Sequence, residues 1–276
     1  MQFTHVETLV VEYVDYLSEG EVPLLRNILS FPNLVRIRLR CDLNDKRHFA
    51  CLWSSCSPAL RHLSLITSLT AKALSSTSSP TSSSMSAPAA AATLESLQML
   101  SWDTCDYQLI QDSPLLDLSQ LTFLRVGWRT RIPWPDFAPV VQTIQTLHIV
   151  LNFTATSIPL CSFPRLTTLR LCLPDWIPAE GRVQMADQLF SNIGPSNVVQ
   201  RIILAAKENK ILDGPLRELL DSKLSCLPMA QAPMIALEMT PNRYEGIWPF
   251  FIRLNSANML CRVDELGETW SGPMMP

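Results

Sequence analysis

Apolar side chains recur along the chain in one spacing, apolar-x-x-apolar-x-apolar. The pattern begins at residues 6, 34, 60, 94, 121, 144, 166 and 199, and a weaker copy begins at Met234. In each copy the last two apolar positions flank one outward position, which is the period of a strand with one buried face. The sequence therefore predicts eight or nine short strands in a chain built of similar units.

The segments between these strands have helical character. Several carry Asp or Pro near the first turn, as helix starts prefer. Examples are SEGEVPLLRNILSF, DKRHFACLWSSC, PAEGRVQMADQLFSNIG and DGPLRELLDSKLSCL. Short strands that each return through a helix must run parallel. We therefore predict an α/β solenoid, a horseshoe with a parallel sheet on its concave side and helices on its convex side.

One phrase, F-P-x-L-x-x-[IL]-R-L, occurs twice, at residues 31–39 and 163–171. With LRHLSLIT and LTFLRVGW, these stretches resemble leucine-rich repeats of the ribonuclease-inhibitor-like kind, and the resemblance covers residues 6–205. The Asn or Cys that usually follows the strand in that family is mostly absent or shifted here. The nearest equivalents are Asp42, Cys105, Asn152 and Asp175.

The irregular repeat lengths, the F-P-x-L entries and turns such as LPDWIP also resemble the repeat regions of fungal F-box proteins. This resemblance implies substrate recognition for a cullin-type ubiquitin ligase. No F-box module, which opens with a Leu-Pro pair and an acidic residue, is visible in the sequence. Contact with a ligase adaptor would therefore need a missing N-terminal segment or a separate partner.

The domain organisation follows from where the pattern stops. We predict irregular repeats over residues 1–205, interrupted at 67–93 by a Ser/Thr/Ala/Pro insertion that is too poor in apolar residues to order. Residues 206–270 form the last repeat and a C-terminal cap. Residues 271–276 form a disordered tail.

Composition narrows the class of protein. The 276 residues are 47% hydrophobic and 17% charged, typical of a folded chain, and the net charge of -3 argues against nucleic-acid binding through bulk charge. No apolar stretch is long enough for a membrane span, and the N-terminus lacks the pattern of a signal peptide. Eight cysteines without a CxxC pair predict buried or half-buried thiols. We expect a cytoplasmic or nuclear protein.

Catalytic and cofactor motifs are missing from the sequence. The glycines never form GxG, and neither GxSxG nor HExxH occurs. The nearest approach to a metal site is His48, Cys51, Cys56 and His62, whose spacing fits no common zinc pattern. We predict no catalytic residues, no metal and no cofactor.

The outward strand positions carry the most informative chemistry. If the strands stack in register, the position between the last two apolar residues forms one column: Val10, Arg38, Ser64, Gln98, Arg125, His148, Arg170 and Ile203. A neighbouring column runs Thr8, Arg36, His62, Ser96, Phe123, Thr146, Thr168 and Arg201. From these columns and their flanks we predict a partner-binding set on the concave face: Arg36, Arg38, Arg40, Arg61, His62, Phe123, Arg125, His148, Arg170 and Arg201.

Arginine is suited to carboxylates and phosphates because its planar guanidinium donates two parallel hydrogen bonds. The hypothesis is that this face binds an acidic or phosphorylated protein segment. A solvated sheet face also needs polar outward residues without any partner, so this reading stays open. Two further classes remain: a structural scaffold without a role in ubiquitylation, and an enzyme on an α/β scaffold.

Overall fold

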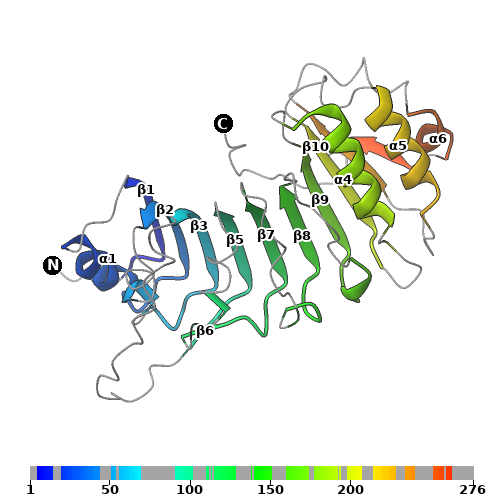
Figure 1. The fold of residues 1–276 in the computed structure, drawn as a ribbon. Coiled ribbons are helices and arrows are strands. Elements are labelled where there is room, and N and C mark those ends of the chain that lie inside the picture. Colours follow the sequence, from blue (N-terminus) through cyan, green and yellow to red (C-terminus); the bar gives the residue numbers. More distant parts are fainter. Residues whose placement is uncertain are drawn as a thin grey trace. The chain divides into compact units, whose positions relative to one another are not determined.

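The structure is a computed structural model, and it is shown as a ribbon in Figure 1. It describes residues 5–14, 20–43, 51–53, 56–69, 91–101, 110–111, 113, 115–128, 138, 140–150, 160–173, 177–191, 193, 198–206, 214–227, 234–239, 251–257 and 259–262. The chain divides into two compact units, Met1–Ile144 and Gln145–Pro276. Each unit is described separately below, and the division falls within the predicted 1–205 array.

The first unit contains five parallel strands, each hydrogen-bonded to the next in chain order. They are β1 (Thr8–Val14), β2 (Arg36–Leu43), β3 (His62–Leu69), β5 (Ser96–Ser101) and β7 (Phe123–Trp128). The helix α1 (Glu21–Leu29) connects β1 to β2, and residues 51–53 are also helical. Two short strands, β4 (Ala92–Thr93) and β6 (Leu116–Asp117), pair separately in parallel.

The second unit repeats the parallel arrangement. Its strands, again neighbours in chain order, are β8 (Thr146–Val150), β9 (Thr168–Leu173), β10 (Arg201–Ala206), β11 (Met234–Met239) and β12 (Leu260–Arg262). Between them lie the 3-10 turn η2 (Leu160–Ser162) and the helices α4 (Ala179–Ser191), α5 (Gly214–Ser225) and α6 (Ile252–Ser256). The α/β class with parallel strands is confirmed, and every predicted strand is present.

The template positions form the core of both units. The first apolar position is completely buried at Leu34, Leu60, Leu94, Leu121 and Leu166. The other two template positions are equally inaccessible, at 0 to 2% exposure, on the strands β2, β3, β5, β7, β8 and β9. Burying each such side chain contributes about 1.5–3 kcal/mol, so a strand is held mainly by its three apolar residues.

The repeated F-P-x-L phrase builds a β-turn that leads into a strand. In both copies the Leu amide donates to the Phe carbonyl three residues earlier, at 3.1 Å for Leu34 and Phe31 and at 3.4 Å for Leu166 and Phe163. Proline occupies the second position of the turn, where its fixed φ suits a type I or II turn. The turn exposes the proline and turns the leucine into the core.

The same turn occurs where the sequence phrase is less obvious. Leu60 donates to the carbonyl of Ser57 at 3.1 Å, and Leu121 donates to the carbonyl of Leu118 at 3.0 Å. Ser57, completely buried, also donates its hydroxyl to the carbonyl of Pro32 at 3.1 Å and so ties its own turn to the preceding one. One local device therefore starts four strands.

A second repeated device joins each strand to its neighbour at their first residues. The carbonyl just before a strand accepts hydrogen bonds from two successive amides of the next unit; Glu7, for example, accepts from Val35 and Arg36, at 2.9 Å each. Val35, Arg61, Glu95, Gln145 and Thr167 accept in the same way. This repetition of contacts sets the register of the strands.

The predicted insertion is narrower than the sequence suggested. Residues 67–69 belong to β3, because their backbone continues to pair with β2 at residues 41–43. At the other end, residues 92–93 form β4 and pair with β6. Residues 70–90 of the predicted insertion, and the predicted tail at 271–276, lie outside the described residues.

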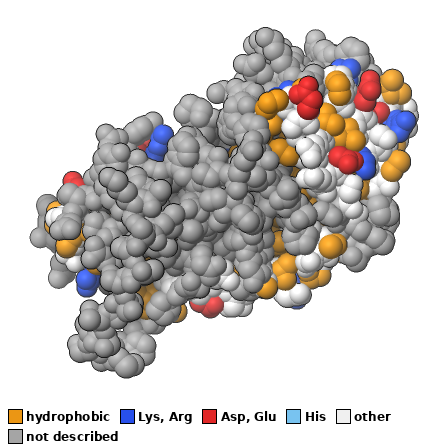
Figure 2. Space-filling view, in the orientation of Figure 1, with side chains coloured by type: hydrophobic (Ala, Val, Ile, Leu, Met, Phe, Trp, Pro, Cys, Tyr) orange, Lys and Arg blue, Asp and Glu red, His pale blue; other side chains and the backbone are white. Residues whose placement is uncertain are grey.

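The helical surface of the second unit mixes both charges. Figure 2 shows acidic and basic side chains interspersed over α4 and α5. Lys223 of α5 lies 2.7 Å from Asp187 of α4 and also donates to the hydroxyl of Ser191 at 3.2 Å.

None of the described helices is long and apolar enough to cross a membrane.

Candidate functional site

The outward residues of the first unit align as the sequence predicted. Backbone pairing places Arg38 between Val10 and Ser64, and continues through Gln98 to Arg125. The neighbouring column runs Thr8, Arg36, His62, Ser96 and Phe123. Adjacent strands are about 4.8 Å apart, so these side chains are neighbours across the sheet. We call the set Arg36, Arg38, Arg40, His62, Phe123 and Arg125 the arginine face.

The residues of the arginine face remain accessible to different degrees. Arg36 is exposed, while the other five members of the set are half-buried. Val10, beside Arg38 in the register, is 54% exposed although it is apolar. The face therefore combines cationic and apolar contact area, the combination that protein interfaces favour.

The equivalent columns of the second unit have the predicted register but are largely covered. His148 pairs with Arg170, and Arg170 with Ile203. The three residues are only 4%, 4% and 0% exposed, and Thr168 in the next column is buried as well. The prediction that His148 and Arg170 lie on an open face is thus wrong. The next residues of this column, Ile203 and Ala236, are apolar and buried, because contact of apolar side chains with water is unfavourable. Arg201, in the neighbouring column, is half-buried.

Arg38 and Arg36 of the arginine face differ in whether an acidic side chain lies close to their positive charge. Arg38 lies 3.6 Å from Glu12, with side chains that are 33% and 47% exposed. An ion pair of that exposure contributes roughly 0.2–1 kcal/mol and opens easily when a better acceptor arrives. Arg36 makes neither an ion pair nor a side-chain hydrogen bond within the described part of the chain.

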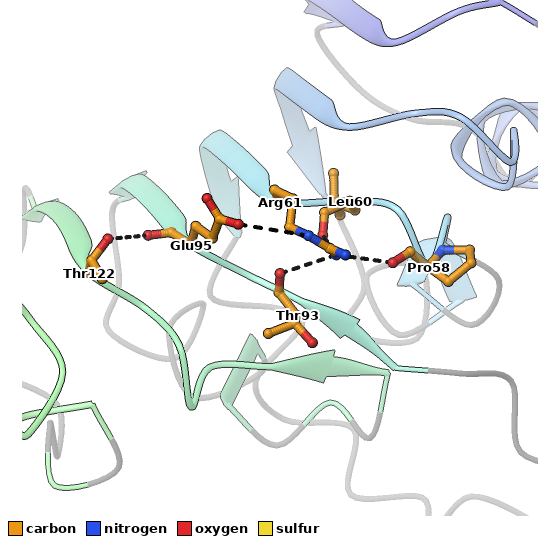
Figure 3. Close-up of polar contacts among 6 residues, drawn as sticks. All are labelled: Pro58, Leu60, Arg61, Thr93, Glu95 and Thr122. Carbon is orange, nitrogen blue, oxygen red and sulfur yellow. Dashed lines mark hydrogen bonds and ion pairs between the residues drawn. The ribbon is translucent and has the colours of Figure 1, made fainter.

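Arg61 belongs to the structural frame rather than to the arginine face (Figure 3). Its Nη1 donates to the carbonyls of Pro58 at 3.1 Å, Leu60 at 3.0 Å and Thr93 at 3.5 Å. Its Nε lies 3.9 Å from a carboxylate oxygen of Glu95. The guanidinium thus ties the turn before β3 to the end of β4. The prediction of Arg61 as a partner-binding residue missed these contacts because Thr93 is 32 residues away in the sequence.

The environment of His62 suppresses its protonation. Burial lowers the pKa of the imidazole below its usual 6.5, and the charge of Arg36 lowers it further. Glu95 acts in the opposite direction, and Arg61 adds a weaker lowering effect. At neutral pH the ring is therefore uncharged, and the arginines carry the positive charge of the face.

The His/Cys cluster considered as a zinc site is described only at Cys51, Cys56 and His62. Burial raises the pKa of the Cys56 thiol to about 11, so at neutral pH and without a metal this side chain is a protonated thiol. The Cys56 Sγ donates to the carbonyl of Leu115 at 3.7 Å. His48 lies outside the described residues, and within them no three His, Cys, Asp or Glu side chains form a metal-binding group.

The described cysteines differ in solvent exposure more than the sequence suggested. Cys56 is buried and Cys51 and Cys172 are half-buried, as predicted. Cys161 and Cys226 are exposed, so the prediction of uniformly buried thiols is wrong for these two. Cys161 lies in η2 and Cys226 directly follows α5, and chain reversals of this kind present side chains to water.

The comparisons with known proteins identify no family. No protein-family model matches the chain, and no curated protein resembles it at a significant level.

Proposed function

We propose that this chain is a non-enzymatic protein-recognition module, a leucine-rich-repeat solenoid that binds an acidic or phosphorylated protein segment on the arginine face. The observation that carries the proposal is the register of β1, β2 and β3, which sets Arg36 and Arg38 on one accessible sheet surface. The sheet fixes the backbone positions of these two arginines, and each planar guanidinium can donate two parallel hydrogen bonds to a carboxylate or a phosphate.

Support for the solenoid comes from the repetition of local devices. The same turn, the same buried leucine and the same carbonyl bridge recur from strand to strand. Repetition of one supersecondary unit, with each unit packed on its neighbours, is typical of solenoids. We further propose that the partner is a substrate of an F-box-type ubiquitin ligase, by resemblance to fungal F-box proteins.

The test is affinity capture from a native lysate with two charge-matched variants. Arg36→Glu/Arg38→Glu reverses the charge on the arginine face. The control, Arg26→Glu/Arg165→Glu, reverses two exposed arginines located on α1 and on the turn before β9. Arg170 is left unchanged because it is buried.

The expected result is a set of partners lost by the face variant, retained by the control and displaced by an acidic competitor peptide. Ligase adaptors in the same captures would support the ubiquitylation setting. If both variants capture the same proteins as the wild type, the arginine face is a solvated sheet surface and the recognition proposal is wrong. Partners shared by all three proteins would indicate a scaffold that binds elsewhere.

A further inference from the structure

We infer that Arg36 and His62 together bind one phosphorylated side chain of the partner, with Arg36 as the permanent cation and His62 as a group that takes up a proton when the phosphate docks. This inference rests on the proposed function and assigns its anchor point. A phosphomonoester in a protein segment is the ligand class.

Geometry places the two side chains side by side. Arg36 and His62 are direct Cα partners in the register of β2 and β3, so both side chains leave the same face of the sheet. Arg36 is exposed and His62 is half-buried beside it. A phosphate oxygen that accepts from the guanidinium of Arg36 therefore has an imidazole nitrogen within reach on the next strand.

Arg36 is more available to a new partner than Arg38 of the face or the nearby Arg61. Arg38 is engaged by Glu12 at 3.6 Å, and Arg61 is held by three backbone carbonyls. Arg36 has no such competitor within the described part of the chain. Docking an anion there breaks no ion pair among the residues that the structure describes, and this makes Arg36 the preferred anchor.

Charges around His62 make it responsive to an arriving anion. Arg36 faces it from β2, Arg61 lies directly before it in the chain at the start of β3, and Glu95 lies directly before β5, the next strand. The two arginines disfavour the imidazolium, and Glu95 favours it. A phosphate dianion on Arg36 offsets that cation and places negative charge beside the ring, so it stabilises the imidazolium.

The same arrangement distinguishes a phosphate from a carboxylate. A phosphomonoester carries close to two negative charges at neutral pH and three acceptor oxygens. It can accept from the guanidinium and the imidazolium at the same time. A Glu side chain has one charge and two oxygens, so it compensates Arg36 and leaves less charge to hold a proton on His62.

The experiment measures the pKa of His62 by NMR in the full-length chain, without ligand and with saturating N-acetylphosphoserine amide. We expect the probe to raise the pKa of His62. Arg36→Gln should weaken probe binding about three- to tenfold and abolish the rise. Arg26→Gln, the control on α1, should leave both unchanged, whereas N-acetylglutamate amide and dimethyl phosphate should give a smaller rise.

Several outcomes would overturn the inference. One is a His62 pKa that does not respond to the probe, and another is no detectable binding of the probe. An equal response to dimethyl phosphate would also overturn it, because the site would then read a phosphodiester. Partner capture separates this failure from failure of the proposed function. If His62→Gln leaves capture intact while Arg36→Glu/Arg38→Glu abolishes it, the face binds a partner without the His62 anchor.

Discussion

At the scale of single residues, neighbours across the sheet decide the chemistry of a side chain. His62 and Arg36 are 26 positions apart in the sequence but adjacent in the register. Partial burial, and after it the charge of Arg36, lower the pKa of His62, so the ring stays neutral at pH values where a solvated histidine begins to titrate. Cys56 shows the same dependence, because burial raises the pKa of its thiol to about 11 and removes its reactivity.

The lowered pKa of His62 predicts a stability that falls in acid. Between the folded-state pKa and the unfolded-state value near 6.5, the unfolded chain binds more protons than the folded one. The contribution of His62 to the free energy of unfolding is therefore fully present above pH 6.5 and is lost as the pH falls through this interval. Because the ring is partly solvated, we expect less than about 1 kcal/mol.

Urea unfolding at about pH 7.5 and about pH 5.5 measures this effect in the wild type and in His62→Gln. The variant should lose less stability on acidification than the wild type, since its side chain does not titrate. The remaining titratable groups change the stability of both proteins by the same amount, so their effects cancel in the comparison. An identical loss in the two proteins would contradict the assignment.

At the scale of elements, helices and turns are completed by groups from other elements. The first turn of α6 is capped from α5, because Asp221 accepts from the amide of Arg253 at 3.0 Å and from that of Leu254 at 2.9 Å. Phe251, at the N-cap position of α6 itself, provides no side-chain hydrogen bond. Arg61 plays a similar role for the turn before β3 and for the end of β4.

Asp221→Ala should destabilise the chain by about 2–3 kcal/mol, since it leaves two amides and their buried surroundings without an acceptor. Asp187→Ala is the matched control on the neighbouring helix. Asp187 forms an exposed ion pair with Lys223, and its removal should cost below about 1 kcal/mol. Chemical denaturation of the two variants measures both values. Equal losses would show that Asp221 does not hold α6.

Arg61→Met should cost about 1–2 kcal/mol, because it keeps an apolar side chain in place of the arginine stem but removes the guanidinium that donates to three carbonyls. The loss should be local, with faster hydrogen exchange at the amides of Ala92 and Leu94. Arg165→Met, on the exposed turn before β9, should leave both stability and exchange unchanged. Unchanged exchange near β4 in Arg61→Met would contradict the structural role of this residue.

At the scale of the whole molecule, one sequence pattern produces two different environments. Arg38 and Arg170 occupy the same position of the F-P-x-L phrase and equivalent outward positions on their own strands, β2 and β9. The side chain of Arg38 is 33% exposed, whereas Arg170 as a residue is 4% exposed. The two arginines have equivalent positions in the sequence pattern, but the residues packed around each of them give them different exposure to solvent.

This difference predicts opposite tolerance to charge reversal. Arg38→Glu should change the free energy of unfolding by less than about 1 kcal/mol, since the side chain is partly solvated. Arg170→Glu should cost at least about 3 kcal/mol, because it places an anion where a buried cation was held. Thermal and chemical unfolding of the two variants provides the comparison. Equal stability would show that the outward column of the second unit is open after all.

The strands could be predicted because each one is specified by the spacing of apolar residues within a short stretch of sequence. Three apolar residues at fixed spacing specify a strand and its buried face, and equal spacing in successive copies specifies the register. The columns through Arg38 and Ser64 follow from those positions alone. The roles of Arg61 and Asp221 were not predictable, because each depends on a partner about 32 residues away and brought close only by the fold.

The sequence by itself determined the α/β class, the parallel strands and the alignment of outward residues, because these follow from apolar spacing and from short connections. Only the tertiary structure decided which outward residues reach solvent. It buried His148 and Arg170, turned Arg61 toward carbonyls and left Arg36 accessible beside His62. The physical reason is that accessibility and charge balance depend on everything packed around a side chain, and a repeating pattern carries no record of those surroundings.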